Sequence, residues 1–233
     1  MHAVIDPTFL SRFLLFDGLT KEELSSLSHL LHQKVFPAGA NLITAEQSGE
    51  VVYLIADGTV KIFLEREDGT EVILAILGNG DTVGEMSLID NTNRCASVVT
   101  LEKSSLLWMD HSAFNNSLRQ MPRIGCNLST ILARRLRLAN EQIQALAALE
   151  VESRVARQIL AFATQYGRET ENGDIIIPIR LTQSDLAGLV GASRERINQV
   201  IVAYKERHYI SVDQRYHIII HNKAALLRNV VRC

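Results

Sequence analysis

The spacing of apolar residues changes twice along this chain of 233 residues. From Val35 to about Met109, short runs of alternating apolar and polar residues are separated by turns such as Asp57-Gly58 and Asp68-Gly69. This alternation is typical of strands with one buried face, and the β-branched runs on either side of 65–71 indicate a hairpin tip there. So many short strands predict a barrel or a jelly roll.

Helical signals lie on both sides of this region. Before it, we expect short helices over 10–14 and 21–31, the second with a capping box of Thr20 and Glu23. After it, apolar spacings of three and four predict one long helix over 113–148. Its apolar seam consists of Leu128, Leu132, Leu136, Ala139, Ile143 and Leu146. A second copy of the chain would cover this seam, or the helix would lie back on the barrel.

A mixed pattern follows the junction at 150–153. We expect an amphipathic helix over 154–166, a strand over 175–179, two short helices, and a final hairpin of 210–212 with 217–220. The whole chain is therefore predicted to be α+β, with a barrel or jelly roll over 1–112, a long helix over 113–149 and a mixed region of helices and short strands over 150–233.

The two short helices carry the signals of a helix-turn-helix. Thr182 caps the first, Gly191 allows a tight left-handed turn, and Ser193 caps the second. The apolar face of the second helix consists of Ile197, Val200, Ile201 and Tyr204, and its outward positions are Arg194, Glu195, Arg196, Asn198 and Gln199. Arginine donates to guanine and glutamate accepts from cytosine in the major groove. The segment therefore predicts sequence-specific binding of double-stranded DNA.

Charge and composition agree with this division. The net charge of the chain is −2. Residues 151–233 hold 12 basic and 8 acidic groups, so their net charge is +4 and that of residues 1–150 is −6. The three cysteines and seven histidines have no disulfide, iron–sulfur or metal-ligand spacing, so no metal is expected. Without a basic leader or ~20 unbroken apolar residues, we expect a cytoplasmic protein without membrane contact.

The segment LTQSDLAGLVGASRERINQVI resembles the recognition motif of CRP/FNR transcription regulators, most closely the cyclic-AMP receptor branch. The resemblance implies a β-roll (jelly roll) over 1–112, a long dimerisation helix over 113–149 and a winged helix-turn-helix over 150–233. It also implies a homodimer that works with RNA polymerase on a palindrome of TGTGA-like half-sites. It assigns base contacts to Arg194 and Glu195, and it leaves the central base open because Gln199 stands where Arg or Lys is usual. The neighbouring DNA-contacting residues would be Asn198 and, at phosphates, Thr182, Gln183 and Ser193.

A second motif, GEMSLIDNTNRCAS at 84–97, is similar to the phosphate-binding cassette of cyclic-nucleotide-binding domains. A short helix after Gly84 would offer backbone N–H groups to an anion, Glu85 would accept from a ribose hydroxyl, and Arg94 would meet the cyclic phosphate. Cys95 stands where Ser or Thr is usual. The expected ligand-contacting residues also include Val83, Met86, Ser87, Ala96 and, on the long helix, Ala139 and Asn140.

The resemblance implies cAMP as the ligand, with Ala139 and Asn140 at the adenine and one of them reaching across the dimer. Other signals stay open, namely another nucleotide, a redox input through Cys95, haem, or no ligand. The Glu85 and Arg94 side chains could instead form a salt bridge that closes a turn. A regulatory module of a kinase or channel would leave 181–206 unused, and no nucleophile–base pair or P-loop points to an enzyme, so no catalytic residue is expected.

Overall fold

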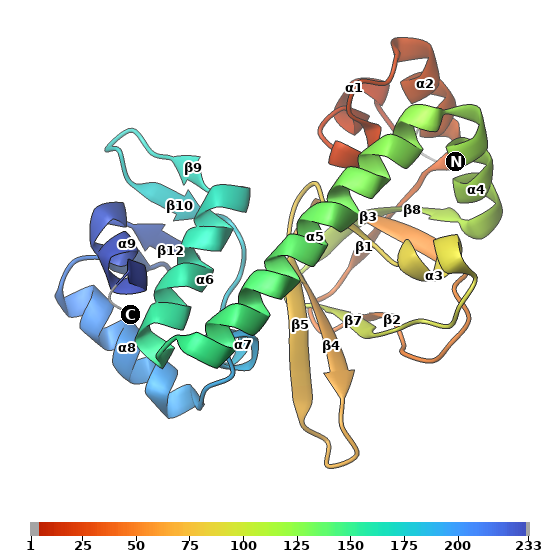
Figure 1. Cartoon of the computed structure of the whole chain (residues 1–233). Helices are drawn as coiled ribbons and strands as arrows, with labels where there is room; N and C mark the ends of the chain where they lie inside the picture. Colours follow the sequence, from red (N-terminus) through yellow and green to blue (C-terminus); the bar gives the residue numbers. More distant parts are fainter. Residues whose placement is uncertain (1–4, 232–233) are drawn as a thin grey trace. The chain divides into compact units, whose positions relative to one another are not determined.

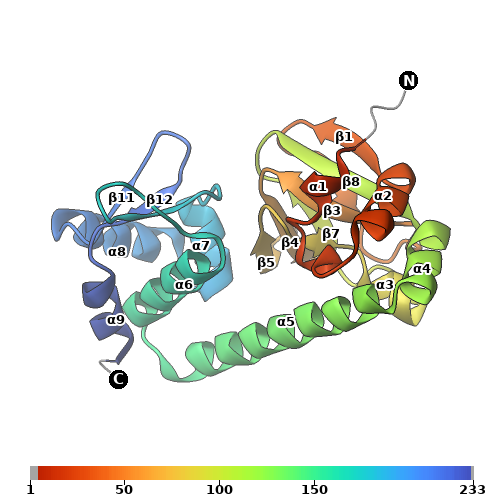
Figure 2. The ribbon, with the colours of Figure 1, turned by 90° about the horizontal axis from the view of Figure 1, so that it is seen from above.

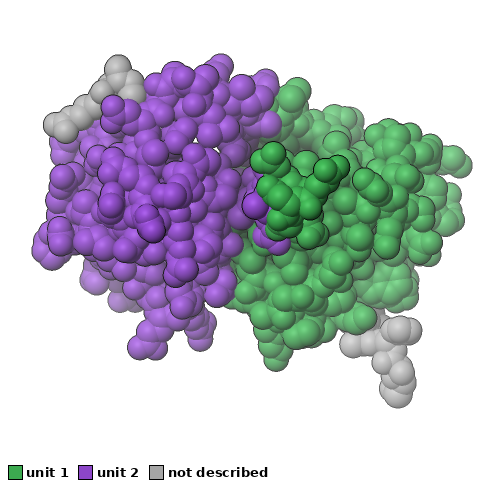
Figure 3. All heavy atoms as spheres, turned by 90° about the horizontal axis from the view of Figure 1, so that it is seen from below, with its two compact units in different colours: residues 1–69, 74–137 green, residues 70–73, 138–233 purple. Residues whose placement is uncertain are grey.

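The computed structural model describes residues 5–231 (Figure 1). The chain divides into two compact units, residues 1–69 with 74–137 and residues 70–73 with 138–233 (Figure 3). No helix within the described residues combines the length and hydrophobicity needed to cross a lipid bilayer.

The first unit opens with α1 (Pro7–Leu10), a 3₁₀ turn (Leu14–Phe16) and α2 (Lys21–Leu30). The capping box of α2 is confirmed, since Thr20 N donates to Glu23 Oε2 (2.8 Å) and Glu23 N donates to Thr20 Oγ1 (3.2 Å). The helix expected over 10–14 is wrong. Asp6 caps α1 and proline occupies its first turn, where the missing N–H has no cost, so the helix starts and ends earlier than the apolar pattern indicated.

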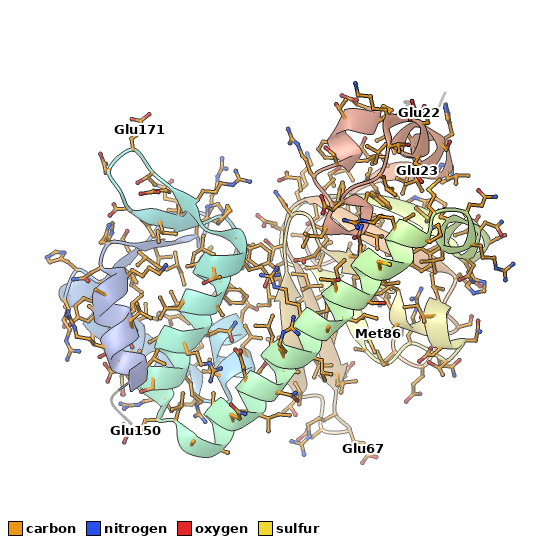
Figure 4. The ribbon with its side chains drawn as sticks, turned by 45° about the horizontal axis from the view of Figure 1, so that its top comes forward. Glu22, Glu23, Glu67, Met86, Glu150 and Glu171 are labelled. Atoms are coloured by element: carbon orange, nitrogen blue, oxygen red, sulfur yellow. The ribbon has the colours of Figure 1, made fainter. Side chains whose placement is uncertain are left out.

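Two four-stranded sheets form the β-roll of this unit (Figure 2). Their orders are β1-β8-β3-β6 and β2-β7-β4-β5. The strands are β1 (His32–Phe36), β2 (Asn41–Ile43), β3 (Val51–Asp57), β4 (Val60–Glu65), β5 (Glu71–Leu77), β6 (Thr82–Val83), β7 (Ser97–Thr100) and β8 (Ser104–Asp110). The predicted roll is confirmed, and so is the β4–β5 hairpin, with Glu67 at its tip (Figure 4).

The core of the roll takes one residue from each of seven strands. This cluster consists of Ile43, Ile55, Val60, Leu77, Val83, Val98 and Leu106. A second cluster lies between the outer face of the β3–β8 sheet and the surrounding helices, and it includes Leu10, Phe13, Leu27, Leu54, Met109, Phe114, Ile124 and Leu128. Burial of these side chains removes a large apolar area from water, which is the main term that favours folding.

The long helix predicted over 113–148 is two helices, α4 (His111–Gln120) and α5 (Pro122–Ala148). Pro122 causes the break, because proline starts helices well but disfavours helical backbone in the residue before it, and Met121 has φ −124° and ψ 79°. The 27-residue helix α5 is still the longest in the described chain (Figure 1).

The apolar seam on α5 is buried only at its start. Leu128 is buried among the helices and the β3–β8 sheet, and Leu132 packs against the same cluster. Farther along, Leu136 is 63% exposed and Ile143 is 64% exposed, and Leu146 is also exposed. The helix therefore lies on the roll at its first turns and presents an uncovered apolar face beyond them.

The second unit contains a four-stranded sheet of order β11-β12-β10-β9 and a group of helices. Its elements are α6 (Val151–Tyr166), β9 (Arg168–Glu169), β10 (Ile175–Ile177), α7 (Gln183–Val190), α8 (Arg194–Glu206), β11 (Ile210–Val212), β12 (Ile218–Ile220) and α9 (Lys223–Val231). The predicted helix-turn-helix and final hairpin are confirmed. Helix α6 begins three residues earlier than predicted, after Glu150, and β9 and α9 had no counterpart in the prediction.

Candidate ligand site and DNA interface

The cassette begins at Gly84, where β6 ends and the five-residue helix α3 (Met86–Asp90) follows. Gly84 has φ +89°, and a Cβ atom at this position would lie 2.8 Å from Arg94 Nη1 and 3.0 Å from the Val51 carbonyl oxygen. Both the backbone conformation and the close approach of Arg94 therefore require glycine.

Arg94 crosses this turn as a buried cation. Its side chain donates from Nη1 to Gly84 O (2.5 Å) and Ser87 Oγ (2.8 Å), and from Nη2 to Val51 O (2.6 Å). The residue is 7% exposed, and these three acceptors are all neutral. Burial lowers the pKa of Arg94, although the nearby Tyr53, Glu85, Cys95 and Glu50 oppose that shift. A buried guanidinium with neutral partners is the electrostatic condition that favours an incoming anion.

Glu85 is close enough to Arg94 to affect the pKa of that arginine, but its carboxylate forms an ion pair with a different arginine. Its Oε1 accepts from Arg135 Nη1 on α5 (2.6 Å), and Arg135 Nη2 donates to the Thr82 carbonyl oxygen. Glu85 is 1% exposed, and its other oxygen, Oε2, is buried without a hydrogen-bond partner in the structure. The alternative of a Glu85–Arg94 salt bridge is therefore not what forms, and Glu85 keeps one acceptor unused.

Arg135 was not among the residues that the sequence motifs predicted at this site. One signal could have identified it, because Arg135 lies four residues before Ala139 and so on the same face of the helix. The contact itself joins residues 50 positions apart in the chain, which no local pattern encodes.

The other expected ligand residues have varied surroundings. Val83 and Ala96 are buried, and Val83 is part of the core of the roll. Ser87 is buried against Arg94, whereas Met86 is exposed on α3 (Figure 4). Cys95 is an exposed free thiol. Ala139 and Asn140 are exposed on the part of α5 that belongs to the second unit, and their contact with a ligand stays a prediction.

The described cysteines are free thiols, and two of the described histidines, His217 and His221, are hydrogen-bonded to carboxylates, Asp213 and Asp174. Cys95 and Cys126 are free and exposed, while Cys233 and His2 lie outside the described residues. Within residues 5–231, no group of three or more His, Cys, Asp and Glu side chains could hold a metal ion.

The helix-turn-helix is held by capping interactions at both helix starts. Thr182 and Asp185 form a capping box on α7, with Asp185 N donating to Thr182 Oγ1 (3.2 Å) and Thr182 N donating to Asp185 Oδ2 (2.9 Å). The turn residue Gly191 has φ +62°, and Ser193 Oγ accepts from Arg196 N (3.2 Å) at the start of α8. These contacts fix the angle at which α8 leaves the turn.

Helix α8 separates an apolar face from a polar one, as predicted. Its inner face is buried, and Arg194, Glu195, Asn198 and Gln199 are exposed. Two contacts orient the polar residues, since Gln183 Nε2 donates to Asn198 Oδ1 (2.9 Å) and Arg196 Nη1 donates to Gln199 Oε1 (3.0 Å). The hydroxyl of Thr182 donates to Asp185, so a phosphate would compete with that carboxylate for it.

Comparison with known families matches both halves of the chain. Residues 33–121 match the family model "Cyclic nucleotide-binding domain", and residues 153–228 match "Crp-like helix-turn-helix domain". The "CRP-like cAMP-activated global transcriptional regulator" of Mycobacterium tuberculosis is 33% identical over 90% of this chain and 93% of the relative. The chain belongs to the CRP/FNR family. It is a DNA-binding transcription regulator with a cyclic nucleotide-binding domain, in a family of regulators rather than enzymes.

Two further comparisons place this CRP/FNR regulator among its relatives. The "Cyclic AMP receptor protein" of Thermus thermophilus is 33% identical over 82% of this chain and 85% of the relative. The structure of FixK2 from Bradyrhizobium japonicum has a TM-score of 0.74 over 85% of this chain and 96% of that chain, at 17% identity. At that identity the likeness shows the fold alone.

Proposed function

We propose that this regulator is a homodimer whose affinity for a palindromic DNA site is controlled by a cyclic nucleotide, with cAMP as the first candidate. The observation that carries the proposal is that the cassette holds two buried groups that a ligand could engage. The Arg94 guanidinium has neutral hydrogen-bond partners, and Glu85 Oε2 has no hydrogen-bond partner in the structure. A ligand that joins an anion to a neighbouring hydroxyl satisfies both, and a ribose cyclic phosphate has that chemistry.

The roles of the cassette follow from its hydrogen-bonding capacity. Arg94 and the backbone N–H groups after Gly84 bind the cyclic phosphate, and Glu85 Oε2 accepts from the ribose hydroxyl. Val83, Met86, Ser87, Cys95 and Ala96 complete the cassette. Cys95 contributes its backbone N–H, because a thiol is a weak donor.

The dimer covers the exposed part of α5. Leu136 and Ile143 are large apolar side chains more than half exposed on one helix, and a second copy of the same helix would bury them around a twofold axis. Ala139 lies on the same seam, and Asn140 follows it with an amide able to pair with the adenine edge.

The Glu85–Arg135 ion pair supports a route from the ligand to the dimer seam. Arg135 lies on α5 next to Leu136, so a ligand that engages Glu85 changes the electrostatic environment of the helix that forms the dimer. Because a ligand shifts an equilibrium by its differential affinity for two states, the nucleotide favours the dimer whose recognition helices lie one DNA turn apart, ~34 Å.

The DNA contacts are assigned to α8 and to residues at the starts of α7 and α8. Arg194 donates to a guanine and Glu195 accepts from a cytosine of a TGTGA-like half-site, with Asn198 and Gln199 facing the adjacent bases. Thr182, Gln183 and Ser193 contact phosphates. The setting proposed is the cytoplasm, with RNA polymerase as the protein partner, in line with membership of a family of transcription regulators.

Calorimetric titration of cAMP into the full-length protein tests the ligand. Wild type should bind cAMP, Arg94→Ala should bind at least tenfold more weakly, and Arg66→Ala, which removes an exposed arginine from the β4–β5 hairpin, should bind like wild type. A gel shift on a TGTGA-type palindrome then asks whether cAMP changes DNA affinity. A folded wild type that does not bind cAMP would refute the assignment of this ligand.

A different signal is the second candidate, favoured by two departures from the usual pocket. Cys95 replaces a hydroxyl and is exposed, and Ala139 has no hydroxyl. If cGMP or another nucleotide binds in place of cAMP, the cassette assignment stands with a changed base. If instead an oxidant changes DNA affinity and Cys95→Ser abolishes that change, the signal is redox.

A further inference from the structure

The recognition helix α8 has an apolar side chain on its polar face. Val202 is 42% exposed, whereas the other exposed positions among the described residues of α8 are charged or amide side chains. None of the capping or base-contact assignments above involves it.

Helical geometry places Val202 at the centre of the face assigned to DNA. At ~100° per residue, Val202 lies about 20° from Glu195, 40° from Asn198 and 60° from Gln199 around the helix axis. It lies about 160° from Tyr204, which is fully buried on the opposite face. Val202 is thus turned away from the domain core as fully as the predicted base-contacting residues are.

The axial position of Val202 also fits the groove. It follows Glu195 by seven residues, a rise of ~10 Å, which is about three base-pair steps of a DNA duplex. A helix that places Arg194 and Glu195 on one pair of bases would hold Val202 over bases three steps farther along the half-site.

The chemistry of the major groove leaves one partner for such a side chain. Every base-pair edge there carries hydrogen-bond donors or acceptors, and the apolar group among them is the C5-methyl of thymine. Local preference does not explain the valine, because a β-branched residue is a poorer helix former than the Lys or Glu that solvent would favour.

We infer that Val202 contacts the C5-methyl group of a thymine and adds a T preference three steps beyond the bases contacted by Arg194 and Glu195. This inference rests on the proposed DNA-binding function. Burial of one methyl-sized group against the valine corresponds to ~0.8 kcal/mol, which is about a fourfold change in affinity.

Deoxyuridine scanning tests the inference, because deoxyuridine keeps the base pair and removes only the methyl group. A preferred site is first selected from a randomised duplex library with wild-type protein, with and without cAMP. Each thymine of one half-site is then replaced in turn, and binding is measured by fluorescence anisotropy. The proteins are wild type, Val202→Ala, and the control Val35→Ala, which changes an exposed valine on β1 of the other unit.

We expect wild type and Val35→Ala to lose about fourfold in DNA affinity when deoxyuridine replaces one particular thymine. Val202→Ala should lose no affinity at that position. Alanine favours the helix, so α8 should remain folded in the variant, as circular dichroism would verify. The inference would be overturned if wild type bound the site specifically but lost no affinity at any replaced thymine. It would also be overturned if Val202→Ala lost as much affinity as wild type at the same thymine, and Val202 would then be an ordinary surface valine. If no sequence is enriched, or Arg194→Ala binds the selected site as tightly as wild type, the proposed DNA readout itself fails.

Discussion

Replacement of Arg135 by alanine should destabilise the β-roll, because it removes the counter-charge of one buried carboxylate, that of Glu85. In the native protein Glu85 is 1% exposed, and its carboxylate accepts a hydrogen bond from Arg135 at 2.6 Å, while Oε2 has no partner in the structure. Arg135→Ala leaves Glu85 buried without a counter-charge and also removes the donor to the Thr82 carbonyl. Glu85→Gln removes the charge that needs the arginine, so the same Arg135→Ala change should cost less in that background.

The magnitude follows from these two contacts. A charge-assisted hydrogen bond contributes ~1.5–3 kcal/mol and a neutral one about 1 kcal/mol. Loss of one partner from a fully buried pair costs ~3–5 kcal/mol, but the side chain of Arg135 is 26% exposed, so water can partly replace it. We therefore expect Arg135→Ala to lower the free energy of unfolding by about 3 kcal/mol, with a coupling of ~1–3 kcal/mol to Glu85.

The single tryptophan of the chain makes the assay specific to this unit. Trp108 lies on β8 of the roll, so its fluorescence during urea unfolding reports on the first unit. With ~1–3 kcal/mol per M as the denaturant slope, the midpoint should fall by about 1 M or more. Protein concentration must be equal throughout, because dimer formation also stabilises the fold.

Arg137→Ala is the matched control, since Arg137 lies two residues farther along α5 and is exposed. It should change the free energy of unfolding by less than ~0.5 kcal/mol. If Arg135→Ala lowers the free energy of unfolding by no more than this control, Glu85 does not need Arg135 as a counter-charge. An equal cost of Arg135→Ala in the wild-type and Glu85→Gln backgrounds would refute the specific role of the ion pair.

Three further changes test the DNA-binding unit. Gly191→Ala places a Cβ at φ +62° and 3.0 Å from Leu146 Cδ2, so thermal unfolding followed by circular dichroism should show a loss of about 1 kcal/mol or more, and an unchanged midpoint would contradict the turn requirement. Tyr204→Phe removes the hydroxyl that donates to the Glu152 carbonyl (3.0 Å) in a fully buried position, which should cost ~1 kcal/mol in urea unfolding; a neutral result would mean that the bond contributes nothing net. For Asp213, burial raises the pKa, but hydrogen bonds from the N–H groups of His217 and Arg215 outweigh it and lower the pKa below 3.8. The carboxylate therefore stabilises the β11–β12 turn at neutral pH and loses this effect as the pH falls below 3.8, so Asp213→Asn should be less stable at pH 7 by about 1 kcal/mol, with a difference that shrinks as the carboxylate is protonated in acid.

Local patterns in the sequence were sufficient wherever a short segment decides its own conformation. The capping boxes at Thr20 and Thr182, the left-handed turn at Gly191 and the alternation of the strands all depend on residues within a few positions of one another. The helix-turn-helix was therefore predictable almost to the residue. Two of the errors in helix boundaries, at Pro7 and Pro122, arose from giving apolar periodicity more weight than proline, although proline acts just as locally.

Side-chain partners in the ligand site depended instead on the folded chain. Arg94 is hydrogen-bonded to Val51, 43 positions away, and Glu85 is hydrogen-bonded to Arg135, 50 positions away. The motif at 84–97 identified the residue types but not these partners, because a contact between distant segments exists only when the sheets and α5 have packed. The unused oxygen of Glu85 likewise follows from burial, which is a property of the whole unit.

The amino-acid sequence by itself thus determined the order of most elements, the turn that joins the two helices of the DNA-binding segment, and the chemical groups available at each motif. Only the tertiary structure decided that the seam on α5 is covered at Leu128 and open at Leu136, and that Arg94 is left with neutral partners. The physical reason is the range of the forces involved. Backbone conformation responds to neighbours in the chain, whereas burial and charge compensation respond to neighbours in space.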